Sequence, residues 1–382
     1  MDRDKELELL SECVKLTGEG RPHMTDDETL VPVAKYLDPA TFERELDLVF
    51  RPSMNLAAHG SQLAAPGDFI TRNLLGAPVI LVRGKDGRAR AFLNVCRHRG
   101  ATVELRERGT CRRFVCPYHA WTYETDGSLA AVRHQEGFPS LDIERNGLVE
   151  LDCREAAGFL WVCPVPGISV DFPDQGTDTL LSELEGLGCG EGAVFESESR
   201  VWKANWKLIV DGGLESYHFK IAHRNTVGGF FADNISTFRF LGDHIRTVLP
   251  RATVPALAER PESEWSIRKD SHLVYAIYPN ATVLMQEGHF ELILMTPLSV
   301  DETRVEIATV APRPGPEGYG EKARAFWAAN HAFTKTTLHE DFELAEQIQR
   351  GMATGANRVF RFGRFEGALS RWHEMLDAKL GR

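Results

Sequence analysis

The sequence Cys96-Arg-His98-Arg-Gly100 is followed by Cys116-Pro-Tyr-His119, with 17 residues between His98 and Cys116. Each segment offers one thiolate and one imidazole, and the short spacings bring both side chains of a segment within reach of one metal centre. Gly100 and Pro117 favour turns, and each segment follows a strand-like run. The pattern predicts a metal site built from two loops of a β-rich region.

The identity of this first metal centre depends on how the ligands are paired. Two cysteines and two histidines suit tetrahedral zinc as well as a [2Fe-2S] cluster in which histidines replace two of the cysteines. Zinc fingers pair cysteine with cysteine and histidine with histidine, whereas here each loop contributes one of each. The string C-x-H-x17-C-x2-H, followed by Ala120-Trp121, closely resembles the Rieske proteins. That resemblance implies that Cys96 and Cys116 hold one iron of a [2Fe-2S] cluster and that His98 and His119 hold the other.

The patterns on either side predict two domains. Alternating apolar runs with glycine turns, such as 77–83 and 89–95 around the turn 84–87, indicate an all-β domain over residues 45–165. A linker rich in Pro, Gly and Asp covers 164–178. Residues 166–382 then mix strand-like runs at 273–278, 281–285, 290–295 and 304–310 with a helical pattern from Gly320 to Gly351. We expect a helical segment at 1–44 to pack with this second domain, and the fold class to be α+β.

A second group of metal-ligand side chains lies in the mixed half of the chain. Asp211, Glu215 and His218 fall at i, i+4 and i+7, so a continuous helix would place them on one face. The flanking residues are too apolar for an exposed helix, which predicts that the polar side chains point into an interior site. His223 would be about 140° out of register with His218, so the helix is expected to bend or end between them.

This second segment resembles the mononuclear-iron segment of Rieske oxygenases, because Asn205-Trp206-Lys207 is followed by D-x3-E-x-Y-H-x4-H. The resemblance implies a facial triad of His218, His223 and a distant aspartate around Fe(2+). Asp341 is the candidate, since it shares an apolar helical stripe with Leu338, Ala345 and Ile348. Glu340 and Asp301 are more distant alternatives.

Two further acidic residues receive roles from the same resemblance. Glu215 occupies the position of an acidic residue that bridges the two metal centres across a subunit boundary. Asp211 matches another position that is usually acidic. Gly212 departs from the asparagine that is frequent in the family, which leaves a polar contribution at that position in doubt.

The family implied is that of terminal oxygenase alpha subunits of ring-hydroxylating Rieske oxygenases, with a helix-grip catalytic domain. Such a protein takes electrons from a ferredoxin or an NAD(P)H-dependent reductase and uses dioxygen to hydroxylate or demethylate a small, aromatic substrate. A homotrimer, or a multiple of one, is expected. The alternatives are a quaternary-amine monooxygenase, a Rieske electron carrier without oxygenase activity, and a zinc-stabilised binding protein.

The pocket for such a substrate has several candidate residues. Aromatic and methionine side chains that could line it, or belong to the ordinary core, are Phe230, Phe231, Met285, Phe290 and Met295.

Composition removes other classes of function. The formal net charge of -11 argues against a nucleic-acid partner, which needs a basic face. No run approaches the roughly 20 apolar residues that cross a bilayer, and the N-terminus is charged, so the sequence predicts a cytoplasmic protein. Seven cysteines, an odd number scattered along 382 residues, indicate reduced thiols instead of a disulfide framework.

Overall fold

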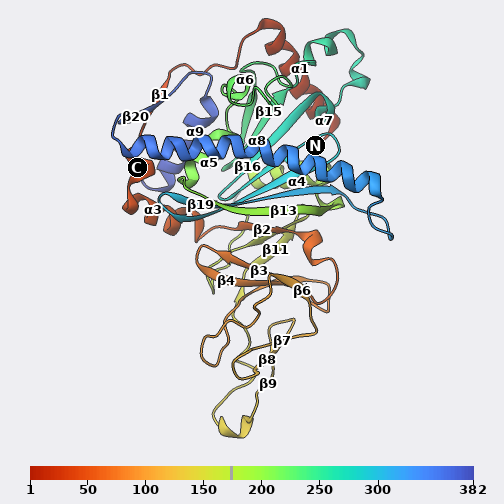
Figure 1. Cartoon of the computed structure of the whole chain (residues 1–382), viewed down its shortest axis with the longest axis vertical. Helices are drawn as coiled ribbons and strands as arrows, with labels where there is room; N and C mark the ends of the chain where they lie inside the picture. Colours follow the sequence, from red (N-terminus) through yellow and green to blue (C-terminus); the bar gives the residue numbers. More distant parts are fainter. Residues whose placement is uncertain (173–174) are drawn as a thin grey trace. The chain divides into compact units, whose positions relative to one another are not determined.

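The computed structural model describes residues 1–172 and 175–382, and the chain divides into two compact units. The small unit is Phe50–Phe172, and the large unit joins Met1–Val49 to Pro173–Arg382. Figure 1 shows the strand-rich small unit in orange and yellow. The observed divisions fall near, but not at, the predicted boundaries after residues 44 and 165.

The small unit consists of three antiparallel sheets. Their orders are β10-β5-β4-β3-β6, β11-β12-β2 and β7-β8-β9. The predicted hairpin is β4 paired with β5, closed by a turn in which Gly87 has φ +80°. The strands are β2 (Asn55–His59), β3 (Asp68–Leu74), β4 (Ala77–Arg83), β5 (Ala89–Leu93), β6 (Arg108–Thr110), β7 (Arg113–Val115), β8 (Thr122–Glu124), β9 (Leu129–Ala131), β10 (Glu150–Leu151), β11 (Cys153–Ala156) and β12 (Phe159–Val162).

The large unit is built on a seven-stranded antiparallel sheet of order β13-β19-β18-β17-β16-β15-β14. Four of its strands match the predicted runs: β16 (Ser271–Ile277), β17 (Ala281–Met285), β18 (Phe290–Ser299) and β19 (Glu302–Pro312). The other three strands were not predicted: β13 (Gly192–Trp202), β14 (Thr237–Leu241) and β15 (His244–Pro250). All six pairings in this sheet are antiparallel, and alternate residues of each strand face the same side.

Helices pack on this sheet, and the long helix α8 (Glu321–Ala353) runs across it in Figure 1. The helix α8 confirms the helix predicted at 320–351. The predicted linker 164–178 is partly wrong, because residues 175–178 form the first turn of α4. The other helices are α1 (Arg3–Glu19), α2 (Ala34–Leu37), α3 (Pro39–Glu45), α4 (Gln175–Gly186), α5 (Trp206–Gly213), α6 (Phe219–Ala222), α7 (Ile267–Asp270) and α9 (Gly367–Lys379).

The ends of the chain join within the large unit. Strand β1 (Thr29–Pro32) pairs with β20 (Val359–Phe362), so the N-terminal segment lies beside the C-terminal one. The α+β fold class is confirmed. Among the described residues no helix is both long enough and apolar enough to cross a membrane.

Candidate metal centres and substrate cavity

The two cysteine–histidine loops of the small unit have the same backbone form. In the first loop the Cys96 N–H donates to the Ala101 carbonyl at 2.8 Å, and the Gly100 N–H donates back to Cys96 at 2.9 Å. The second loop repeats both bonds at 2.9 Å between Cys116 and residues 121 and 120. The fourth residue after each cysteine is left-handed, Gly100 at φ +77° and Ala120 at φ +59°. Each loop is therefore a closed turn, and its histidine lies between the hydrogen-bonded ends.

The four side chains of these loops converge. The Nδ1 atoms of His98 and His119 lie 3.1 Å apart, while Cys96 and Cys116 are buried. Two nitrogens bound at about 2.1 Å to one tetrahedral ion lie roughly 3.4 Å apart, so the histidine pair fits a shared metal. Burial, aided by the charges of His98 and Arg99, lowers the pKa of His119, which favours the neutral imidazole that ligates.

Aromatic side chains pack against the residues of this site. The His98 ring stacks on Trp121 at a centroid distance of 5.0 Å, and the Tyr123 hydroxyl lies 3.4 Å from the Cys96 sulfur. The same hydroxyl accepts a hydrogen bond from the Arg97 N–H at 2.9 Å. The cysteines are therefore buried, whereas the two histidines are half-exposed.

In the large unit His218, His223 and Asp341 come together. The Nε2 atoms of the two histidines are 3.2 Å apart, and the Asp341 Oδ1 lies 3.2 Å from His218 and 2.9 Å from His223. Metal–ligand bonds of about 2.1 Å at right angles separate ligand atoms by roughly 3.0 Å, which is the spacing of a facial triad. These three residues form the one group of possible metal ligands found among the described residues outside the small unit.

The local helix differs from the prediction. A continuous helix from Asp211 to His218 is wrong, because α5 ends at Gly213, before Glu215. The helix is therefore interrupted before His218, and a separate single turn, α6, begins after His218 and ends before His223. His218 lies at the N-cap of α6 and His223 at its C-cap, so the short helix turns both rings toward Asp341 on α8.

Carboxylates hold the outer nitrogens of both histidines. The Glu215 carboxylate contacts the Nδ1 of His218, and Glu340 Oε2 lies 2.7 Å from the Nδ1 of His223. Thr226 donates a second hydrogen bond to Glu340 at 2.7 Å. A proton held on Nδ1 leaves each Nε2 free to ligate. Glu340, which the sequence analysis kept only as an alternative ligand, lies behind His223 and not beside the other ligand atoms.

The charges around His218, His223 and Asp341 favour a bound cation. Burial disfavours protonation of His218, but the hydrogen bonds and charges of Asp341 and Glu215 outweigh it and raise the pKa of His218 to about 10. Burial disfavours ionisation of Asp341, yet the two histidines hold the pKa of its carboxyl below the ordinary value. Three carboxylates around two imidazoles therefore favour added positive charge, which a bound Fe(2+) would supply.

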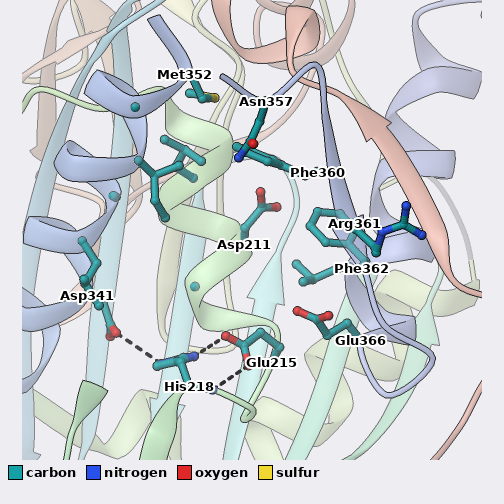
Figure 2. Close-up of a pocket in the computed structure, with 17 residues that line it drawn as sticks. Asp211, Glu215, His218, Asp341, Met352, Asn357, Phe360, Arg361, Phe362 and Glu366 are labelled. Atoms are coloured by element: carbon teal, nitrogen blue, oxygen red, sulfur yellow. Dashed lines mark hydrogen bonds and ion pairs between the residues drawn. The ribbon is translucent and has the colours of Figure 1, made fainter. Parts of the chain in front are cut away.

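Asp211 has a different environment from Glu215. Its carboxylate accepts hydrogen bonds from the Tyr36 hydroxyl at 2.6 Å and from the His373 Nε2 at 3.1 Å. It lines the same hollow as Glu215 and His218 but has no contact with the three candidate ligands that the structure records. Figure 2 shows His218 between Asp341 and Glu215, with Asp211 above Glu215 and Glu366 to its right.

A second cavity, of about 270 Å³, is lined by His223 and Asp341, whereas His218 and Asp341 line the first hollow. It lies between α5, α8 and the face of the sheet that carries Leu249, Val274 and Ile293. Of the candidate pocket residues, Phe230, Phe231 and Met295 line it, whereas Met285 and Phe290 belong to the buried core. Five phenylalanines contribute to its wall: Phe219, Phe230, Phe231, Phe333 and Phe342.

Comparisons with known proteins agree with this architecture. Residues 53–142 match the Rieske [2Fe-2S] domain, and residues 190–382 match the catalytic domain of the ring hydroxylating alpha subunit. The fold and the two matched domains define an iron–sulfur protein with a second metal site, and both groups of candidate ligand residues lie in these domains. The chain belongs to the family of ring-hydroxylating alpha subunits of Rieske oxygenases. The predicted [2Fe-2S] cluster and mononuclear iron are the cofactors that these two domains carry.

Individual relatives differ in what they act on. The carnitine monooxygenase oxygenase subunit of Acinetobacter baumannii is 36% identical over 222 residues, 55% of each chain. The 2-halobenzoate 1,2-dioxygenase large subunit of Burkholderia cepacia is 30% identical over 322 residues, 73% of this chain and 67% of that protein. A crystal structure of a quaternary ammonium Rieske monooxygenase with its substrate gamma-butyrobetaine superposes with a TM-score of 0.74 at 25% identity, over 92% of this chain and 96% of that one. The matched region spans about half the length of the first of these relatives.

Proposed function

We propose that this chain is the terminal oxygenase component of a Rieske oxygenase, which uses dioxygen and external electrons to oxidise a small organic substrate. The observation that carries the proposal is the position of His218, His223 and Asp341. Their ligand atoms lie within 4.8 Å of one another, beside an apolar cavity of about 270 Å³. An electron carrier needs only the small unit and has no use for such a cavity.

In this proposal Cys96, Cys116, His98 and His119 hold the [2Fe-2S] cluster, and His218, His223 and Asp341 hold Fe(2+). The bound iron supplies a site with open coordination positions at which dioxygen can be activated. The chain itself provides the rest. Glu215 and Glu340 fix the proton of each histidine on Nδ1, and the phenylalanine wall keeps water away from the substrate.

The cavity supports two classes of substrate. Phenylalanine faces pack against an aromatic ring, and they also attract a quaternary ammonium group through cation–π contact. The first class corresponds to the halobenzoate dioxygenase and the second to the carnitine monooxygenase. We favour an aromatic substrate, with the quaternary amine as the alternative, since the wall has phenylalanine but neither tryptophan nor tyrosine among its described residues.

Electrons would come from a ferredoxin or an NAD(P)H-dependent reductase, which would reduce the cluster at Cys96, His98, Cys116 and His119. We further propose a homotrimer, or a multiple of one, in which Glu215 links the cluster of one subunit to the iron of the next. A head-to-tail interface that closes into a ring can place a donor against an acceptor in this way. Asp211 would support Glu215 from the same hollow. The cytoplasmic location remains a prediction from the sequence.

A single-turnover experiment tests the proposal. The iron-loaded protein is reduced without oxygen and then exposed to ¹⁸O₂ with a panel of aromatic acids, methoxyarenes and betaines. We expect one or two labelled oxygen atoms in a product, detected by mass spectrometry. The His223→Ala variant, which keeps the cluster, should form none. Labelled product from that variant, or zinc in place of iron at the His98 site, would contradict the proposal.

A further inference from the structure

The cavity beside His223 and Asp341 contains a charged side chain that the proposed chemistry does not use. Arg251 is the one lysine or arginine among the described residues that line it. The only carboxylate in the same lining is Asp341, at the metal site. About half of that lining consists of phenylalanine and aliphatic side chains, beside which an arginine charge is stabilised by an anionic partner.

The backbone and His272 fix the position of Arg251. It follows β15 directly, its N–H donates to the Asp270 carbonyl at 3.0 Å, and it forms a bridge with Phe231. Its Nη2 lies 3.3 Å from the His272 Nε2. A guanidinium has only donors, so the His272 Nε2 must be the acceptor and its ring proton must be on Nδ1.

His272 is suited to this role as a neutral acceptor. Burial, with the charges of Arg251 and His289, lowers the pKa of His272 to about 3. The ring also meets the edge of Phe231 at a centroid distance of 4.8 Å, which limits its rotation. His272 therefore orients the guanidinium without neutralising it.

No carboxylate of the described chain pairs with this guanidinium. The nearby Asp270 directs its carboxylate to Arg260 at 3.3 Å and to the Ser266 N–H at 2.8 Å. The Nε of Arg251 is buried and has no hydrogen-bond partner among the residues that the structure describes. The guanidinium lines the cavity and has donors beyond the one that contacts His272, and such a guanidinium is the usual recognition element for a carboxylate.

We infer that Arg251, oriented by His272, binds a carboxylate of the substrate, so that the substrate class is a small organic acid. The apolar body of that acid then extends along the phenylalanine wall toward His223 and Asp341. Arg251 determines specificity, since it selects an anionic end group and fixes which carbon of the substrate faces the metal. This inference rests on the proposed function, because the bound acid is a substrate only if the chain is an oxygenase.

Binding of matched acid and amide pairs tests the inference without any turnover. The probes are benzoate with benzamide, phenylacetate with phenylacetamide, and gamma-butyrobetaine with its carboxamide. Dissociation constants are measured by calorimetry on the oxidised, iron-loaded protein without oxygen. We expect at least one acid to bind roughly 10- to 100-fold more tightly than its amide, the range expected for a charge-assisted hydrogen bond to a buried anion.

Variants then assign that preference to Arg251. Arg251→Gln should bring the acid and its amide to equal affinity, and Arg251→Lys should retain part of the preference. Arg324→Gln, at an exposed position of α8, makes the same change of net charge and should keep the full preference. Unchanged iron content and melting temperature show that the Arg251 variants are folded.

The inference is overturned if no acid outbinds its amide, or if the preference survives in Arg251→Gln. Its failure is distinct from failure of the proposed function. Oxygen transfer to neutral substrates without an acid preference would remove the role of Arg251 and keep the oxygenase. An acid preference without any oxygen transfer would do the reverse.

Discussion

The two metal centres of this protein are built in different ways. The four proposed ligands of the small-unit centre come from two loops between residues 96 and 119, each closed by its own hydrogen bonds. The proposed ligands of the large-unit centre lie at the two ends of a single helical turn and at Asp341 on α8, more than a hundred residues away. The first centre is defined by local turns, so it should respond to backbone changes in those turns. The second depends on packing and on the carboxylates behind its histidines.

Loss of one ligand gives the largest expected effect and separates the two centres. His223→Ala should lose the mononuclear iron, keep the visible absorption of the cluster, and lower turnover by about 10³-fold or more, since metal-assisted chemistry loses its metal. His98→Ala should show the opposite pattern, with the cluster spectrum lost and the second iron retained. Iron analysis and absorption spectra measure both. Loss of both centres in either variant would show that they are not independent.

Glu215→Gln should give the next largest effect. Both centres remain occupied at saturating iron, yet turnover falls roughly 10- to 100-fold, the range for loss of a residue that orients a metal ligand. If Glu215 also carries the electron path, rapid mixing of the reduced protein with substrate and oxygen should show slow reoxidation of the cluster. Turnover equal to that of the unaltered protein would exclude the proposed bridge.

Glu340→Gln tests whether the large-unit centre depends on support from α8. The variant loses the carboxylate that holds the His223 Nδ1 proton, so iron affinity should fall by about tenfold, measured by competition with a chelator. Glu343→Gln is the matched control, because Glu343 is exposed on the same helix. Equal affinities in the two variants would mean that α8 contributes only Asp341.

Paired changes in the two small-unit loops should give the smallest effect. Gly100→Ala should destabilise the small unit by about 1 kcal/mol through its left-handed backbone alone, since a Cβ there would meet no atom within 4 Å. Ala120→Gly relieves the same strain in the second loop and should leave stability unchanged or raise it by less than about 1 kcal/mol. Chemical denaturation followed at the cluster absorption measures both. A loss of stability in Ala120→Gly would indicate that the Ala120 side chain packs usefully.

The sequence alone determined the features that are local. The two loops, the hairpin of β4 with β5, four strands of the large sheet and the helix α8 follow from spacing, turn residues and hydrophobic periodicity over a few residues. Resemblance to the family then pointed to Asp341. The end of α5 at Gly213 was not predicted, although the pair Gly212 and Gly213 is a local signal that disfavours a continuing helix.

Tertiary structure decided the features that need distant residues. Only the fold places the Glu340 carboxylate beside the His223 Nδ1 and the Asp211 carboxylate beside Tyr36 and His373. The fold also buries Met285 and Phe290 in the core, whereas Met295 lines the cavity. Arg251 carried no signal in the sequence, since one arginine after a strand is ordinary. The role inferred for Arg251 depends on the absence of a paired carboxylate among the described residues around it. Those residues come from many separate segments of the chain, so the sequence near Arg251 does not reveal the absence.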